Sequence, residues 1–134
     1  MLLFYASQKN KAVEMLKDII LQRLPIHQAM FCKTVDAMEK QLRRPGGNLD
    51  ILLVSVRDTI EMAEMARMSP LFLDTRLILV LPRRDDTIVI RAHKLGPRFI
   101  AYRDNGLEQV ASVLDKMLSN IRRSETIEEH EQLK

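Results

Sequence analysis

The stretch that decides the fold is Asp50-Ile51-Leu52-Leu53-Val54-Ser55, which follows Pro45-Gly46-Gly47 and precedes Arg57-Asp58. A short apolar run between turn residues and a capping residue is typical of a buried strand. Strands of a parallel sheet are covered by helices on both faces, so they read as continuous Leu, Val and Ile. The stretch therefore predicts the central strand of a parallel sheet. Its carboxyl end, at Ser55, is where an α/β domain places its functional groups.

The same pattern continues on both sides of this strand. Apolar runs predict four more strands, at residues 2–6, 28–33, 76–82 and 99–102. Apolar residues at helical spacing predict helices at 9–24, 35–44, 59–68, 86–95 and from 106 to 121. Thr34, Asp85 or Asp86, and the capping-box pairs Asp58 with Glu61 and Asn105 with Glu108, are the expected helix starts. Strand and helix alternate five times, which predicts a three-layer α/β fold with a five-stranded parallel sheet.

The length of 134 residues fits one domain, which we expect to span residues 1–123. Residues 124–134 hold four glutamates against one lysine, a balance of −3, and we expect this acidic tail to be frayed or disordered. Because the whole chain carries +3, residues 1–123 carry +6. A moderately basic body permits an acidic partner. Without a Lys/Arg run or interleaved aromatic residues, it argues against nucleic acid as that partner.

The composition also indicates the cellular compartment. Cys32 is the single cysteine, which excludes an internal disulfide and a cysteine-based zinc site and fits a reducing environment. The opening residues lack the basic region and the length of a secretory signal, and no apolar stretch approaches the roughly 18 residues of a membrane span. We therefore expect a cytoplasmic protein without a membrane partner.

The order of elements resembles the receiver domain of bacterial response regulators, over residues 2–123. The 50–55 strand resembles the Asp-Leu-Ile-Leu-Leu-Asp strand of that family, and Gly96-Pro97 precedes the last strand as Gly-Ala does there. The resemblance implies a flavodoxin-like strand order of 2-1-3-4-5. It also implies a catalytic set: two acids that bind Mg²⁺, an aspartate that accepts phosphate, a Ser or Thr, and a Lys.

This chain departs from that set at nearly every position. The acidic pair becomes Ala6 and Ser7, the acceptor becomes Ser55, the hydroxyl residue becomes Leu81, and the lysine becomes Arg103. Mg²⁺ requires hard oxygen ligands, and a serine hydroxyl needs a base to act as a nucleophile, whereas no histidine lies near these strand ends. We predict a degenerate receiver that is not an enzyme, binds no metal or cofactor and does not undergo aspartyl phosphorylation.

Arginines gather where the acids are missing, and two interpretations are open. Because a guanidinium group suits phosphate and carboxylate, the four could form an anion site; the alternative is that they pair with the neighbouring Asp58, Asp85, Asp86 and Asp104. The four are Arg57, Arg83, Arg84 and Arg103.

A protein interface is expected on the surface formed by helix 86–95, strand 99–102 and the last helix. Ile90 lies nearly opposite Ile88 on its helix and therefore faces water, and Tyr102 lies on the adjacent strand. The resembling family uses this surface for dimerisation and docking. Met62, Met65 and Met68 are candidates for a second, adaptable surface, because they point in different directions around their helix and cannot all be core. The alternative is that most of them fill the core.

Two functional hypotheses follow. The first is a non-enzymatic signalling or scaffold module of the two-component type that acts through protein contacts, including a homodimer. The alternative is a domain that recognises a phosphate-bearing ligand or phosphoprotein at its arginine-lined edge.

Overall fold

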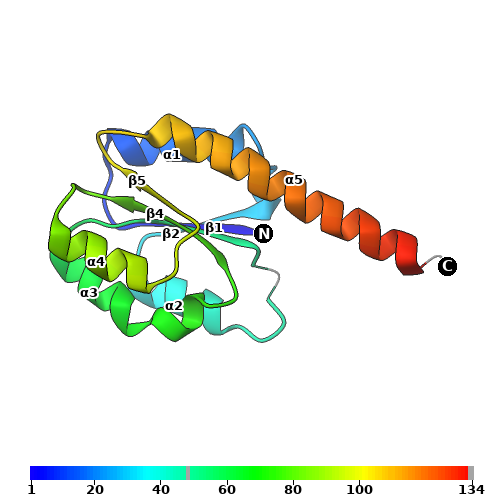
Figure 1. Cartoon of the computed structure of the whole chain (residues 1–134), viewed down its shortest axis with the longest axis horizontal. Coiled ribbons are helices and arrows are strands. Elements are labelled where there is room, and N and C mark those ends of the chain that lie inside the picture. Colours follow the sequence, from blue (N-terminus) through cyan, green and yellow to red (C-terminus); the bar gives the residue numbers. More distant parts are fainter. Residues whose placement is uncertain (48, 133–134) are drawn as a thin grey trace.

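The computed structural model describes the backbone of residues 1–47 and 49–132 and the side chains of residues 1–47 and 49–123. Strands and helices alternate along the chain (Figure 1). The strands are β1 (Leu2–Ala6), β2 (Ala29–Cys32), β3 (Ile51–Ser55), β4 (Arg76–Leu81) and β5 (Phe99–Tyr102). The helices are α1 (Lys11–Leu21), α2 (Val35–Arg43), α3 (Thr59–Arg67), α4 (Asp86–Lys94) and α5 (Leu107–Gln132).

The five strands form one parallel sheet, as the sequence predicted, and their order of β2-β1-β3-β4-β5 is the one that the resemblance implied. Helices α1 and α5 cover one face, and α2, α3 and α4 cover the other, which gives three layers (Figure 1). The carboxyl ends of the central strands are level, because Ala6 of β1 is opposite Ser55 of β3, and Ser55 is opposite Val80 of β4. Any group that follows these strands therefore lies at one edge of the sheet.

The core is divided by the sheet into two clusters. In β1, Leu2, Phe4 and Ala6 pack under α1 and α5, whereas Leu3 and Tyr5 pack under α2, α3 and α4. Successive side chains of a strand point to opposite faces, so a strand buried on both sides needs apolar residues at every position. That requirement explains the uninterrupted apolar runs in β1, β3 and β4.

Four helices begin at a polar cap. The side chains of Asn10, Thr34, Asp58 and Asp85 each accept a hydrogen bond from a backbone N–H group in the first turn that follows. The sequence predicted Thr34, Asp58 and Asp85 but not Asn10, and its prediction of Asn105 is wrong. Helix α5 begins at Leu107, so the residue before it is Gly106, while Asn105 forms an isolated antiparallel bridge with Tyr102.

Of the two alternatives for the methionines in and after α3, core filling is confirmed and the adaptable surface is wrong. Met62, Met65 and Met68 are all buried in the cluster under α2, α3 and α4. The helix ends at Arg67, and Met68 leaves the helical conformation, with φ −97° and ψ 12°. Because the helical spacing no longer applies to it, the side chain of Met68 can turn back to the core. No adaptable methionine surface exists on this helix.

Two short 3-10 helices, Ile26–Gln28 and Ser69–Phe72, were not predicted from the sequence. Helix α5 continues to Gln132, past residue 123 where the sequence ended the domain, and its second half projects away from the sheet (Figure 1). The fraying expected for residues 124–134 stays a prediction. Among the helices described, none is long and apolar enough to cross a membrane.

Candidate functional site

The fold brings the predicted positions together at the carboxyl edge of the sheet. Three of them are the last residues of strands, and two follow directly after a strand. Ala6, Ser55 and Leu81 end β1, β3 and β4, whereas Ser7 follows β1 and Arg103 follows β5. Ala6, Ser55 and Leu81 are buried, with Leu81 fully inaccessible, so the exposed polar surface of the edge comes from the connections beyond the strands.

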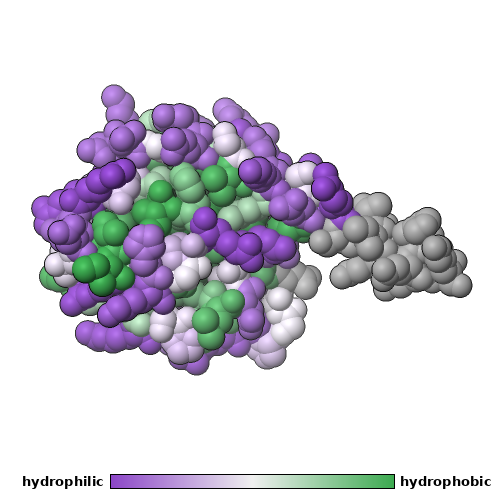
Figure 2. Space-filling view, in the orientation of Figure 1, coloured by the Kyte–Doolittle hydropathy of each residue, from purple (hydrophilic) through white to green (hydrophobic). Residues whose placement is uncertain are grey.

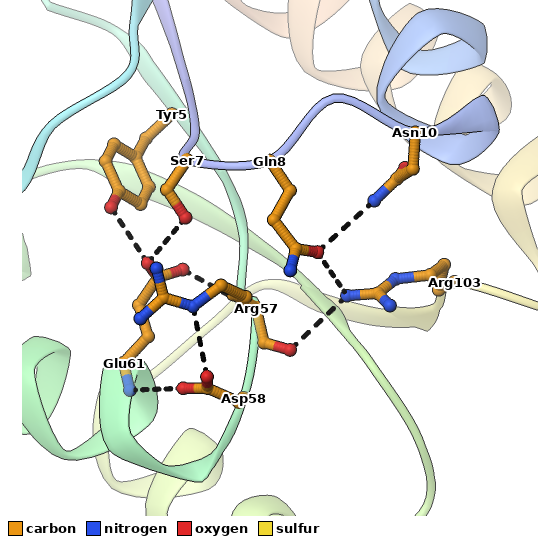
Figure 3. Close-up of polar contacts among 8 residues, drawn as sticks. All are labelled: Tyr5, Ser7, Gln8, Asn10, Arg57, Asp58, Glu61 and Arg103. Carbon is orange, nitrogen blue, oxygen red and sulfur yellow. Dashed lines mark hydrogen bonds and ion pairs between the residues drawn. The ribbon is translucent and has the colours of Figure 1, made fainter.

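The centre of this edge is a buried carboxylate that the sequence analysis did not place there. Glu61, in the first turn of α3, is only 2% exposed. One oxygen, Oε2, accepts hydrogen bonds from the Tyr5 hydroxyl at 3.0 Å and from the Ser7 hydroxyl at 2.8 Å. The other oxygen, Oε1, accepts a hydrogen bond from the backbone N–H of Arg57 at 2.9 Å (Figure 3). Both oxygens of the carboxylate are therefore occupied by donors from within the chain.

Asp58 explains why Glu61 points back toward β1. The Asp58 side chain caps α3 by accepting a hydrogen bond from the Glu61 backbone N–H at 2.9 Å. A glutamate at the third helical position can then reach back over the start of its own helix, as in a capping box. Here its acceptor oxygen meets the N–H of Arg57, one residue before the cap. The same turn brings the carboxylate to the end of β1.

The polar groups of this network have shifted protonation equilibria. Burial raises the pKa of the Tyr5 hydroxyl above its usual value near 10, and the negative charge of Glu61 raises it further. The backbone N–H of Glu61 lowers the pKa of Asp58, and the guanidinium of Arg57 adds to this effect. At neutral pH the site therefore contains a protonated tyrosine and an ionised aspartate.

The four arginines do not converge on one empty point. Arg57 pairs with Asp58, at 3.0 Å from Nε to Oδ2, and Arg83 lies 3.7 Å from Asp85. These two contacts fit the pairing interpretation.

The other two arginines make different contacts. The Arg103 Nη2 atom donates to the carbonyl oxygen of Arg57 at 3.4 Å and to the Gln8 side chain at 3.5 Å, so Arg57 and Arg103 are neighbours (Figure 3). The guanidinium of Arg84 lies over the ring of Tyr102, with Cζ 4.7 Å from the ring centroid. Arg84 thereby lies beside the proposed interface.

Sequence reasoning identified Glu61 as a helix-start residue but missed its contacts with Tyr5 and Ser7. These residues are 56 and 54 positions away in the chain, and spacing says nothing about such contacts. One signal was available: Glu61 and Met65 are four residues apart and share a helical face, so an acid stands on an apolar stripe. An acid on a buried face needs hydrogen-bond donors, which points to the polar residues at the end of β1.

The predicted interface residues are accessible on a second surface. Ile90 on α4 is 58% exposed, and Phe99, Ile100 and Tyr102 of the edge strand β5 are partly buried. Figure 2 shows hydrophobic surface between the polar residues of α4 and α5, over this strand. An apolar strip with a polar border is the composition expected of a protein contact surface.

Among the residues whose side chains are described, no group of three or more His, Cys, Asp or Glu side chains is placed to hold a metal ion. Two of the acids at the carboxyl edge, Asp58 and Glu61, already accept hydrogen bonds from within the chain.

The fold class defined by these features is a flavodoxin-like three-layer domain with strand order 2-1-3-4-5. Among solved structures, it is similar to the crystal structure of a putative pilus assembly-related protein from Burkholderia pseudomallei. The TM-score is 0.56 with 15% sequence identity, over 88% of each chain. No protein-family model and no curated protein match the sequence. At this level of identity the similarity shows a common fold.

Proposed function

We propose that this chain is a non-enzymatic, receiver-like module that acts through protein contacts without aspartyl phosphorylation. The observation that carries the proposal is the state of the Glu61 carboxylate, whose two oxygens accept from Tyr5, Ser7 and Arg57. A receiver uses its edge carboxylates to bind Mg²⁺. Here the buried carboxylate is held by in-chain donors, and Ser55 stands at the position of the phosphate acceptor.

The setting of this function is proposed from the structural neighbour. That neighbour is described as related to pilus assembly and has the same fold over most of its length. A scaffold module in a multi-protein assembly of this kind needs contact surfaces and does not need a reaction of its own. We accordingly propose that the present chain works within such an assembly, on the cytoplasmic side.

The contact surface proposed for this role is formed by α4, β5 and α5. Its support is the 58% exposure of Ile90 and the partly exposed residues of β5 beside it. We propose a second copy of the chain as one occupant of this surface. The alternative function, recognition of a phosphate-bearing ligand, has less support, because Arg57 and Arg83 are near Asp58 and Asp85.

Incubation with acetyl phosphate and Mg²⁺ tests the proposal. Intact-mass spectrometry is expected to show no phosphoryl adduct, because a serine hydroxyl needs a base to act as a nucleophile and the Ser55 hydroxyl donates no hydrogen bond to a basic side chain in the part of the chain that the structure describes. Light scattering of the same samples is expected to give the same molar mass with and without the two reagents. A receiver domain that retains all of its acids, treated in parallel, shows that the reagents are active.

A phosphoryl adduct, or an oligomeric state that changes with acetyl phosphate, would contradict the proposal. Either result would mean that the carboxyl edge still works as a switch despite the missing acids.

A further inference from the structure

We propose that Glu61 acts as a built-in anion, filling a small carboxylate-binding pocket that the carboxyl edge of the sheet would otherwise present. Removing its side chain should therefore leave a site for a free carboxylate of similar size, such as formate. This proposal does not depend on the proposed function, because it concerns what occupies the pocket and not whether the chain is phosphorylated.

The pocket is defined by three donors from two stretches of the chain that are distant in sequence, one at the end of β1 and one after β3. The Tyr5 hydroxyl comes from β1, the Ser7 hydroxyl from the connection after β1, and the Arg57 N–H from the connection after β3. Their distances to the carboxylate are 3.0, 2.8 and 2.9 Å. Three donors within this range, directed at two oxygens, match the requirements of any small carboxylate.

The surroundings also favour a negative charge. The pocket lies at the amino end of α3, where the helix dipole contributes partial positive charge. The charge of the nearby Asp58 is offset by its ion pair with Arg57. Because Glu61 is only 2% exposed, the bound carboxylate is shielded from water, and its hydrogen bonds are correspondingly strong.

An internal anion has a structural consequence. It ties the end of β1 to the connection that leads from β3 to α3, so both connections are held in one arrangement. These hydrogen bonds are made by the chain's own carboxylate. The edge is then ordered without any added ligand.

Formate rescue of Glu61→Ala tests this inference. The variant is expected to unfold at a lower temperature than the wild type, because Tyr5 and Ser7 lose their acceptor. Sodium formate at ten times its dissociation constant should raise the melting temperature of the variant by about 5 °C relative to equal sodium chloride. The wild type, whose pocket is filled, should show no such difference between the two salts.

Glu64→Ala is the matched control, because it removes the same charge three residues along the same helix from a side chain that is partly exposed. It should respond to formate as the wild type does. Adding Ser7→Ala to Glu61→Ala removes one donor, and the formate concentration needed for half of the effect should rise roughly tenfold.

If Glu61→Ala does not fold in chloride, its far-ultraviolet circular dichroism in increasing formate replaces the melting temperature, and recovery of the helical signal in formate alone is the expected result. The inference is overturned if the variant responds to formate and chloride equally. It is overturned too if wild type and Glu64→Ala respond to formate as strongly as Glu61→Ala does.

Discussion

At the scale of single residues, the side-chain carboxylate of Asp58 has two roles. It caps α3 through the backbone N–H of Glu61 and forms an ion pair with Arg57. Both contacts favour the ionised form, so the pKa of Asp58 lies below its usual value in the folded chain. A group whose pKa falls on folding stabilises the fold above its unfolded pKa, and this contribution is lost as the pH falls through the folded pKa.

Asp58→Asn should isolate this charge effect, because asparagine is also a good helix cap. At pH 7 the variant should have a lower free energy of unfolding than the wild type. The gap should narrow below about pH 4, where aspartate in the unfolded chain becomes protonated. Urea denaturation of both proteins at pH 7, 4 and 2.5 measures this difference in the free energy of unfolding.

Arg57→Gln is the control for this experiment. It removes the guanidinium of Arg57, the second cause of the low pKa of Asp58, and keeps the hydrogen bond from the Glu61 N–H. In the Arg57→Gln background, Asp58→Asn should therefore lower the free energy of unfolding by less than it does in the wild type. A gap that is constant across the three pH values would show that the charge of Asp58 does not stabilise the fold.

The sequence identified Asp58 and Glu61 as a capping pair, because capping depends on neighbours within four residues. It did not identify the carboxylate pocket, because Tyr5 and Ser7 approach Glu61 only after β1 and β3 have paired. The positions at which a receiver would carry its acids could be located from the sequence, because each one lies next to a strand end and strand ends are visible in the apolar pattern.

At the scale of elements, the start of α5 shows how a backbone conformation can outweigh a sequence pattern. Asn105 and Glu108 have capping-box spacing, yet the residue before the helix is Gly106, whose φ is +96°. Residues with a side chain rarely adopt this conformation. The chain turns sharply after β5, with Asn105 bonded to Tyr102, and glycine permits that turn.

Gly106→Ala should therefore destabilise the fold by about 1 to 2 kcal/mol, the cost of a side chain in left-handed backbone. A Cβ atom at this position would be 3.4 Å from the Gln109 side chain, an ordinary contact, so the cost comes from the backbone and not from a clash. Thermal or urea unfolding measures the change.

Asn105→Ala is the paired variant. The bonds described between Asn105 and Tyr102 involve only backbone atoms, so alanine preserves them, and the stability should change by less than about 0.5 kcal/mol. If Asn105→Ala greatly lowered the free energy of unfolding and Gly106→Ala left it unchanged, Asn105 would be the residue that caps α5.

All five strands and all five main helices were predictable, because the strands are apolar runs, the helices have apolar residues at helical spacing, and turn or cap residues lie between them. The two 3-10 helices were missed because three or four residues are too short to show a period. Met68 was misplaced because the prediction continued the helical spacing one residue beyond the end of α3.

At the scale of the whole molecule, the sheet has two edge strands, β2 and β5. Beside β5, Ile90 is exposed on α4, and the partly buried residues of the strand add to an apolar strip (Figure 2). An edge strand with apolar neighbours is prone to pair with another molecule unless it is protected. A controlled contact with a second copy is one way to protect it.

Ile90→Asp should weaken self-association through this surface, because an aspartate would have to lose its water in the contact. Light scattering over a range of protein concentrations should show a lower average molar mass than for the wild type. Ile60→Asp is the control, since Ile60 is 69% exposed on α3 and lies outside the proposed surface. If Ile90→Asp leaves the molar mass unchanged, or if both variants lower it equally, α4 and β5 do not form the dimer contact.

The 2.8 Å hydrogen bond from Ser7 to Glu61 also bears on how such a domain can evolve. Replacing Ser7 with aspartate, the residue type that binds metal in the resembling family, would bring a second carboxylate up against the buried Glu61. Two carboxylates this close repel each other unless one is protonated or a cation lies between them. A metal site could therefore arise here only if Glu61 changed first or at the same time. The buried position of Glu61 thus limits the order in which substitutions could build such a site.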